Sequence, residues 1–562
     1  MQQILEQLDE QQRAAATALL GPVAIRAGAG SGKTRTITHR IAHGVASGVY
    51  NPDKVLALSY TRKAALELGE RLAQLQVPGV TSRTFHSLAL EQLHEFWPTV
   101  VGGERPTPLG STAKLLLVQQ AATEAALQVS DAVAREILAE LEWRKVSALS
   151  YEGYLSAQRT GVVGVKPQQV VEVMRAYEEL KISRRVIDFE DVIALTAGML
   201  AAEDAIARKV QQRFRYFTVD EYQDISPLQY TLLHEWLGEN NNNLCVVGDA
   251  SQTIFSFAGA NQNFLLRFAK EYPEATTITL HRNYRSTAGI VTAANNLMRQ
   301  APGAIELQAV AGGGSAPRAA WFRTGREELQ AVTAAVKQQI SAGTPESQIA
   351  VLARTNQQLA EISEVLRASG VKTQLPEDPW LFSFPVVKNA VIALKAAAAQ
   401  ADAQSPQQDA EHTVLDVLRA AGYSTKAAAD PEREAQRRLL QRLLAVIDTH
   451  CAALPLPEIA KRLQEMMATH FVPQEAAVVL LPIHSAKGLE WHTVYIIGAS
   501  EGKLPIQQTL DNAAAIAEEQ RLAYVAFTRA RELLRVSLSG SEQQGVAPSR
   551  FLQQAKIPVQ RF

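Results

Sequence analysis

The stretch Ala27-Gly28-Ala29-Gly30-Ser31-Gly32-Lys33-Thr34 follows the apolar run Val23-Ala24-Ile25 and opens a segment with helical spacing. A strand, a glycine-rich turn and a helix in this order form a phosphate-binding loop. The three glycines let backbone N–H groups close around phosphate oxygens, and the helix N-terminus adds a favourable field for the anion. The alternative is a glycine-rich turn that contains Gly-Lys-Thr by chance.

A second chemical signal lies far downstream, where the β-rich run 217–219 ends in Asp220 and Glu221. In a phosphate-binding site Lys33 would reach the β- and γ-phosphates, and Thr34 and Asp220 would hold Mg²⁺. Glu221 would accept the proton of the attacking water. An isolated Asp-Glu pair is usually a solvated turn, but its place after a strand and downstream of the loop favours the catalytic interpretation.

Short β-branched runs followed by turns and helical stretches recur along the chain, which indicates parallel sheets covered by helices. The predicted strands lie at 23–25, 55–60, 217–219, 244–247, 349–353, 478–483 and 493–497. Residues 108–192 and 377–474 have helical patterns without strand signals, so we expect each to be a helical insertion in an α/β unit. The biased stretch 396–410 predicts a flexible connection.

Composition narrows the classes of protein. The 562 residues suggest three or four packed units, and the net charge of −1 excludes a basic surface over the whole chain. Any contact with nucleic acid must therefore use a local groove. Two cysteines exclude a disulfide scaffold and a four-cysteine metal site. The N-terminus has no signal-peptide pattern and no long apolar run occurs, so we expect a soluble cytoplasmic protein without a membrane partner.

Together with AGAGSGKT and VDEYQD, an ordered set of further motifs resembles the superfamily 1A DNA helicases of the UvrD/Rep/PcrA type. These motifs are LDEQQ (8–12), ALSYTRKAA (57–65), RTFHS (83–87), GDASQTIFSFAGA (248–260), LHRNYRS (280–286), VLARTN (351–356), HSAKGLEW (484–491), EEQRLAYVAFTRA (518–530) and PSRFL (548–552). The family accepts Ala27 at the first position of the loop.

The resemblance implies an α/β fold of two RecA-like P-loop motor domains with parallel sheets, each carrying a mainly helical insertion. The implied segments are 1–107 and 193–281 for motor domain 1A, 108–192 for insertion 1B, 282–376 and 475–562 for motor domain 2A, and 377–474 for a shortened insertion 2B. ATP would bind between the two motors.

The resemblance also implies roles for single residues in the nucleotide site. Gln12 would read the adenine edge, Tyr284 would stack on adenine, and Gln252 would sense the γ-phosphate. Further matching positions are Arg35 and Glu490 as nucleotide contacts and Arg285 and Arg529 as arginine fingers. A planar guanidinium suits the charge that develops on a transferred phosphoryl group, whereas an arginine outside such a motif would usually form a surface salt bridge.

For single-stranded DNA, stacking rings and phosphate donors are needed. The candidates are Tyr60, Phe255 and Phe257 for stacking and Thr61, Arg62, Thr84, His86 and His484 for the backbone. Tyr60 and Phe257 match family stacking positions. Core packing is the favoured interpretation for Phe255, and both histidines could equally be structural.

The chain also departs from the family. Phe257 stands where relatives usually carry Trp, and Ala258 where they carry Arg, so we expect a weaker grip on DNA or an altered coupling. The short insertion 377–474 bears on duplex unwinding, although not on movement along a strand.

The leading hypothesis is an ATP- and Mg²⁺-dependent helicase that moves 3′ to 5′ on single-stranded DNA, unwinds tailed duplexes and serves DNA repair. A repair or replication protein is a possible partner. The second hypothesis is a translocase that strips proteins from DNA and unwinds only with a partner. The third is a non-motor nucleotide switch or scaffold.

Overall fold

The computed structural model describes residues 2–157, 159, 161–375, 381–400, 407–426, 430–452, 454–468, 477–541 and 545–562. The chain forms two compact units. The first comprises Met1–Glu328 and Ile483–Phe562, and the second comprises Leu329–Pro482. Within the described part of the chain, no helix combines the length and the apolar character that a membrane crossing requires.

A six-stranded sheet in the order β3-β2-β6-β7-β1-β8 organises the first unit, and all its pairings are parallel. Its strands are β1 (Val23–Ala27), β2 (Val55–Ser59), β3 (Thr81–Thr84), β6 (Tyr216–Val219), β7 (Leu244–Gly248) and β8 (Thr276–Leu280). Apolar side chains from both faces are buried, as a parallel sheet covered by helices requires. The helices that follow or precede these strands are α1 (Gln2–Glu6), α2 (Glu10–Thr17), α3 (Lys33–Ala46), α4 (Arg62–Gln74), α5 (Phe85–Val100), α10 (Phe189–Ala202), α11 (Asp204–Arg213), α12 (Pro227–Leu237) and α13 (Asn263–Glu271).

The predicted insertion 108–192 is mainly helical and has a core of its own. Its helices are α6 (Ser111–Glu124), α7 (Asp131–Val146), α8 (Tyr151–Ser156) and α9 (Pro167–Arg184), and the short strands β4 (Thr107–Pro108) and β5 (Val186–Ile187) pair at its two ends. The proposed boundary at 192/193 falls inside α10.

The remaining part of the first unit contains four more parallel strands in the order β15-β16-β11-β17. These are β15 (Trp491–Ile496), β16 (Ala530–Ser539), β11 (Arg318–Phe322) and β17 (Val559–Arg561), accompanied by α14 (Ala288–Met298), α21 (Ala513–Phe527), α22 (Arg550–Gln554) and the short pair β9 (Arg282–Asn283) and β10 (Gln308–Ala309).

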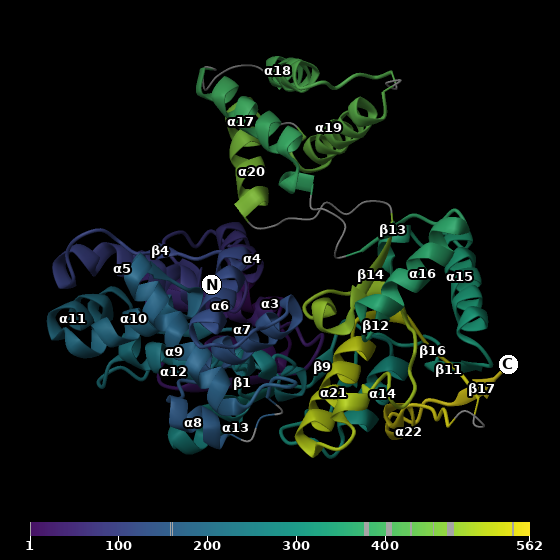
Figure 1. Cartoon of the computed structure of the whole chain (residues 1–562), viewed down its shortest axis with the longest axis horizontal. Helices are drawn as coiled ribbons and strands as arrows, with labels where there is room; N and C mark the ends of the chain where they lie inside the picture. Colours follow the sequence, from purple (N-terminus) through teal and green to yellow (C-terminus); the bar gives the residue numbers. More distant parts are fainter. Residues whose placement is uncertain are drawn as a thin grey trace. The chain divides into compact units, whose positions relative to one another are not determined.

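The second unit contains the parallel strands β12 (Ile349–Ala353), β13 (Thr373–Gln374) and β14 (Val478–Pro482), with α16 (Asn356–Ala368) and most of α15 (Gly325–Ser341). The helices α17 (Pro385–Gln400), α18 (Gln407–Ala420), α19 (Pro431–His450) and α20 (Leu456–Ala468) gather around a separate apolar core (Figure 1).

The prediction of a flexible connection at 396–410 needs a correction. Residues 396–400 end α17, where the four alanines Ala396 to Ala399 favour a helix because alanine has the highest intrinsic helix propensity. Residues 407–410 begin α18. Residues 401–406 lie outside the described residues, as do the proposed boundaries at 376/377 and 474/475. The α/β class with parallel sheets is confirmed, whereas the remaining domain bounds stay predictions.

Candidate active site

The phosphate-binding loop has the backbone that its sequence predicts. Strand β1 ends at Ala27 and α3 begins at Lys33, with Gly30 and Gly32 at φ +68° and +79°. The N-cap of α3 is Gly32, which has no side chain to accept the first N–H groups of the helix. The loop is braced at its centre, where Ser31 Oγ donates to Gly28 O at 2.8 Å and the buried Gln12 Nε2 donates to Ser31 O at 3.0 Å. This cradle suits a polyphosphate.

The carboxylates after β6 reach the same edge of the sheet, since β6, β7 and β1 are neighbours and parallel. Lys33 Nζ lies 2.7 Å from Glu221 Oε1, and both side chains are largely buried. Burial disfavours the charged ammonium, but Glu221, Asp220 and Asp249 outweigh it and raise the pKa of Lys33. Burial also raises the pKa of Asp220, and the neighbouring charge of Glu221 adds to this rise. The two predicted chemical groups, the lysine and the acidic pair, are thus brought together.

The donor set fits a hard cation. Asp220 follows β6 and offers a carboxylate, Thr34 stands one residue into α3 and offers a hydroxyl, and oxygen ligands of this kind are those that Mg²⁺ prefers. A buried carboxylate whose protonation is favoured by a neighbouring negative charge is stabilised by a nearby cation. These residues would hold the ion beside the phosphates.

The segment that carries Tyr284 and Arg285 is seated directly on the loop. Asn283 Nδ2 donates to Ala29 O at 2.6 Å, and Tyr284 N donates to Gly30 O at 2.9 Å. A methyl group on Gly30 would come within 2.7 Å of Arg285 Cβ, so only glycine permits this approach.

The predicted adenine residues meet through Asp9, which caps α2. Asp9 accepts from the backbone N–H of Gln12 at 2.8 Å, and the Tyr284 hydroxyl donates to the same carboxylate. The Tyr284 side chain remains partly exposed, as a stacking platform must be. Arg35 is exposed, and its guanidinium donates to Gln7 at 3.2 Å rather than to another predicted residue.

The two predicted arginine fingers lie in different environments. Arg285 forms an ion pair with Glu490 and donates to Thr528 O at 3.3 Å. Arg529 is buried and donates to the carbonyls of Val525 and Leu489. Burial, together with the nearby positive charge of Arg285, lowers the pKa of Arg529 to about 9. Arg285, Arg529 and Glu490 therefore form one cluster.

Sequence reasoning left two residues of the site without a role. The first is Lys487, whose ammonium pairs with the buried Asp224, donates to Gln252 O at 2.6 Å and lies 4.0 Å from Glu221 Oε2. The second is Tyr524, whose hydroxyl lies between the loop and Asp249. Both occur within motifs that the sequence displays, and a lysine beside a glycine in HSAKGLEW was the available signal for the first.

The rings of three predicted DNA residues, Tyr60, Phe255 and Phe257, lie together beside this cluster and form the candidate DNA track. The rings of Tyr60 and Phe255 stack at 5.7 Å with an interplanar angle of 10°, and Phe257 meets Phe255 edge to face at 6.0 Å. Lys487 Nζ lies 5.1 Å from the centre of the Phe255 ring. Phe257 is 61% exposed, while Phe255 is half-buried rather than part of the core. These rings can offer faces to unpaired bases.

The backbone candidates divide by exposure. Thr61 and Arg62 are exposed at the start of α4, where Thr61 is the N-cap. Thr84 is the N-cap of α5 and is buried, so its hydroxyl already has a structural task.

The two histidine candidates are both half-buried. The His86 ring lies 4.9 Å from that of Phe189, and burial, with help from Lys114 and Arg62, lowers its pKa to about 4. His484 lies in the turn Ile483–Ala486 just before Lys487.

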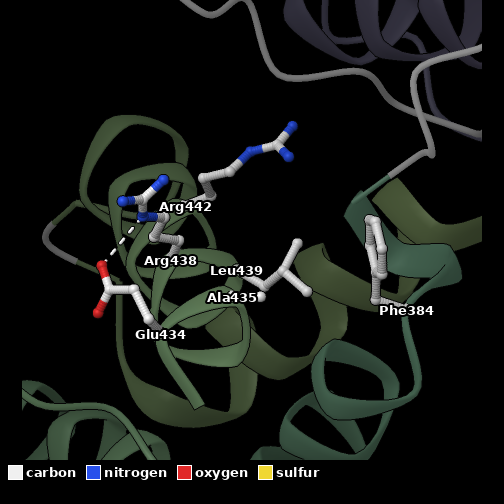
Figure 2. Close-up of a pocket in the computed structure, with 6 residues that line it drawn as sticks. All are labelled: Phe384, Glu434, Ala435, Arg438, Leu439 and Arg442. Atoms are coloured by element: carbon white, nitrogen blue, oxygen red, sulfur yellow. Dashed lines mark hydrogen bonds and ion pairs between the residues drawn. The ribbon is translucent and has the colours of Figure 1, made fainter. Parts of the chain in front are cut away.

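A separate hollow of about 570 Å³ lies on the helical part of the second unit. Figure 2 shows Leu439 of α19 directed towards Phe384, with Arg438 paired to Glu434 and Arg442 extended at the rim. The lining residues of α19 lie about one turn apart, at positions 434, 435, 438, 439 and 442. None of the described residues that line the hollow was predicted as a site residue.

Comparisons with known proteins find family models and relatives that match most of the chain. A family model described as the UvrD/REP helicase N-terminal domain matches residues 8–273, and one described as the UvrD-like helicase C-terminal domain matches 278–421 and 423–541. The ATP-dependent DNA helicase UvrD2 of Mycobacterium tuberculosis is 36% identical over 97% of this chain and 81% of its own length. The ATP-dependent DNA helicases PcrA of Leuconostoc citreum and Bacillus subtilis are 29% and 27% identical, each over 95% of this chain and 82% of their own length.

Proposed function

Since the chain belongs to the UvrD/REP helicase family and is an ATP-dependent DNA helicase, we propose that it moves 3′ to 5′ along single-stranded DNA. We further propose that it uses Mg²⁺ with ATP, unwinds tailed duplexes in the cytoplasm and serves DNA repair. The observation that carries the link between ATP hydrolysis and movement on DNA is the continuity of the two sites, whereas the direction and the repair role rest on the resemblance to the family. Lys487 touches Glu221 and Gln252 on one side and the Phe255 ring on the other.

The hydrolysis step follows from the side chains at the loop. The backbone N–H groups of the loop and Lys33 bind the phosphates, and Glu221 accepts a proton from the attacking water. Lys33 now pairs with Glu221, so ATP must draw the ammonium towards the phosphates and release the carboxylate as a base. Bound Mg²⁺, held by Thr34 and Asp220, would neutralise charge on the phosphates. Arg285 and Arg529 supply planar donors to the transferred group.

Coupling to DNA uses the segment that follows β7. Gln252 lies three residues before Phe255, so a change at the γ-phosphate reaches a stacking ring through a short stretch of backbone. Tyr60 and Phe257 complete the ring set, and each stacked base contributes about 1–3 kcal/mol without sequence preference.

The test is strand displacement by the purified chain on duplexes with a 3′ tail, a 5′ tail or blunt ends, with ATPase measured in the same samples. We expect displacement of the 3′-tailed duplex alone and ATPase stimulated by single-stranded DNA, both abolished by Lys33→Ala. Preference for the 5′ tail would contradict the proposed direction.

One specific observation favours a second candidate, a translocase that unwinds only with a partner. The alignment to PcrA of Bacillus subtilis runs over 615 positions, so that relative carries at least 53 residues that this chain of 562 lacks. We expect part of this difference in the shortened insertion 377–474, which bears on duplex unwinding. DNA-stimulated ATPase without displacement of any duplex would support this candidate. An ATPase activity that DNA does not stimulate would contradict both candidates and favour the third hypothesis, a non-motor nucleotide switch.

A further inference from the structure

One face of α21 holds the segment that links the nucleotide site to the DNA track. Glu518 accepts from the backbone N–H of Ser256 at 3.2 Å, and Arg521 Nε donates to Thr253 O at 2.6 Å. Tyr524, one turn further on, donates from its hydroxyl to Asp249 Oδ2 at 3.3 Å. Residues three apart lie on the same side of a helix, so these contacts form one continuous interface.

The hydroxyl of Tyr524 occupies a special place in this interface. It is buried, it accepts from the backbone N–H of Ala29 in the phosphate-binding loop at 3.4 Å, and it donates to Asp249. A tyrosine hydroxyl has one donor and accepts as well, so both functions are used. The loop and the segment after β7 are thereby joined through one oxygen atom.

Asp249 in turn orients the predicted γ-phosphate sensor. Its Oδ2 accepts from Gln252 Nε2 at 2.8 Å, and its Oδ1 accepts from Ser251 N at 3.0 Å. Asp249 and Gln252 are both buried, so water does not replace a lost partner readily. Because the side-chain nitrogen Nε2 of Gln252 is bound to Asp249, the side-chain oxygen Oε1 of the same amide faces away from Asp249.

We propose that Tyr524 is a positioning residue for ATP hydrolysis, whose hydroxyl fixes Asp249 and, through Asp249, the orientation of the Gln252 amide beside the phosphate-binding loop. This inference rests on the proposed function, because the proposed function gives Gln252 its role at the γ-phosphate. It assigns to α21 a second task, since the same helix leads directly into Arg529. The predicted sensor Gln252 and the predicted arginine finger Arg529 are then both positioned by the helix α21.

The test is Tyr524→Phe, which keeps the buried ring and removes only the hydroxyl. We expect kcat for ATP to fall about five- to twentyfold, both without DNA and at saturating single-stranded DNA, while KM for ATP and the DNA affinity change less than threefold. Tyr177→Phe is the matched control, because among the described residues the buried Tyr177 hydroxyl has no hydrogen-bond partner. The control should retain the wild-type kcat.

A double-mutant cycle with Gln252→Ala separates positioning from packing. If Tyr524 acts through Gln252, Tyr524→Phe lowers kcat no further in the Gln252→Ala background. Multiplicative losses, or a wild-type kcat for Tyr524→Phe, would overturn the inference. If single-stranded DNA does not stimulate the ATPase of the wild-type protein, the proposed function is contradicted instead. The double-mutant cycle would then still test the role of Tyr524 through the ATPase activity measured without DNA.

Discussion

Replacement of Gly30 by alanine tests whether the close seat of the Asn283–Arg285 segment on the phosphate-binding loop is needed for hydrolysis. The new methyl group would lie 2.7 Å from Arg285 Cβ and 2.7 Å from Asn283 Nδ2, whereas ordinary contacts begin near 3.4 Å. The segment must therefore retreat by several tenths of an ångström. That movement stretches the bonds from Asn283 to Ala29 O and from Tyr284 to Gly30 O.

The expected free-energy cost of Gly30→Ala has two parts. A residue with a side chain at φ +68° costs about 1–2 kcal/mol relative to glycine. The two stretched hydrogen bonds are each worth about 0.5–1.5 kcal/mol, which gives a further loss of about 1–3 kcal/mol. If Arg285 acts as the proposed arginine finger, this second part is lost where it meets the nucleotide, and kcat/KM for ATP falls about 5- to 150-fold beyond the effect of backbone strain.

Gly48→Ala is the control that isolates the strain. Gly48 has φ +76° and an added methyl group there meets nothing within 4 Å, so this variant carries the backbone cost without the steric one. The assay is ATPase titrated with ATP at saturating single-stranded DNA, with thermal unfolding measured without nucleotide. Both variants should unfold at a lower temperature, and only Gly30→Ala should lose kcat/KM. Equal kcat/KM for the two variants would refute the reasoning.

Three further predictions concern other parts of the site. Arg529→Lys should lower kcat at least about 100-fold in the DNA-stimulated ATPase assay, because an ammonium cannot reproduce the guanidinium fork and arginine fingers contribute ~10³–10⁵; retention of half the activity would contradict its role. Phe257→Trp should tighten binding of a labelled oligo-dT severalfold in fluorescence anisotropy at fixed salt, since the ring is exposed and a larger face stacks better, and an unchanged affinity would argue against stacking there. Burial and the charges of Lys114 and Arg62 hold the pKa of His86 near 4, below its unfolded value near 6.5, so the unfolded chain takes up this proton first as the pH falls. Stability is therefore lost between about pH 6.5 and 4, and the unfolding temperature should drop less for His86→Gln than for wild type between pH 7.5 and 5.0; parallel drops would refute this.

The sequence predicts the local elements of the site well, because their causes are local. The run before Ala27, the glycines of the loop and the spacing after Lys33 determine β1, the turn and α3 without reference to distant residues. The acidic pair at 220 and 221 is placed correctly after β6 for the same reason, since a β-branched run ends where the carboxylates begin.

Contacts between distant segments could not be predicted in this way. Lys487 meets Asp224 across 263 positions of sequence, and Tyr524 meets Asp249 across 275. No sequence periodicity connects such positions. They meet because segments that are distant in the sequence pack together within the first unit. The error at 396–410 has the opposite origin, because composition alone suggested a linker where the helix propensity of Ala396 to Ala399 extends α17.

If Gln252 senses the γ-phosphate and the rings bind bases, as proposed, the segment from Asp249 to Phe257 couples the nucleotide to the DNA. The first residues of this segment form a tight turn over Ala250–Gln252 and its last a second turn over Ser256–Ala258, with only three residues between the two turns. Tyr524 and Lys487 hold the first turn, and Glu518 holds the second. With these proposed roles, a shift of Gln252 by the γ-phosphate would be transmitted to the rings, and a base that moves the rings would act back on Gln252, because any coupling between two binding sites must be reciprocal.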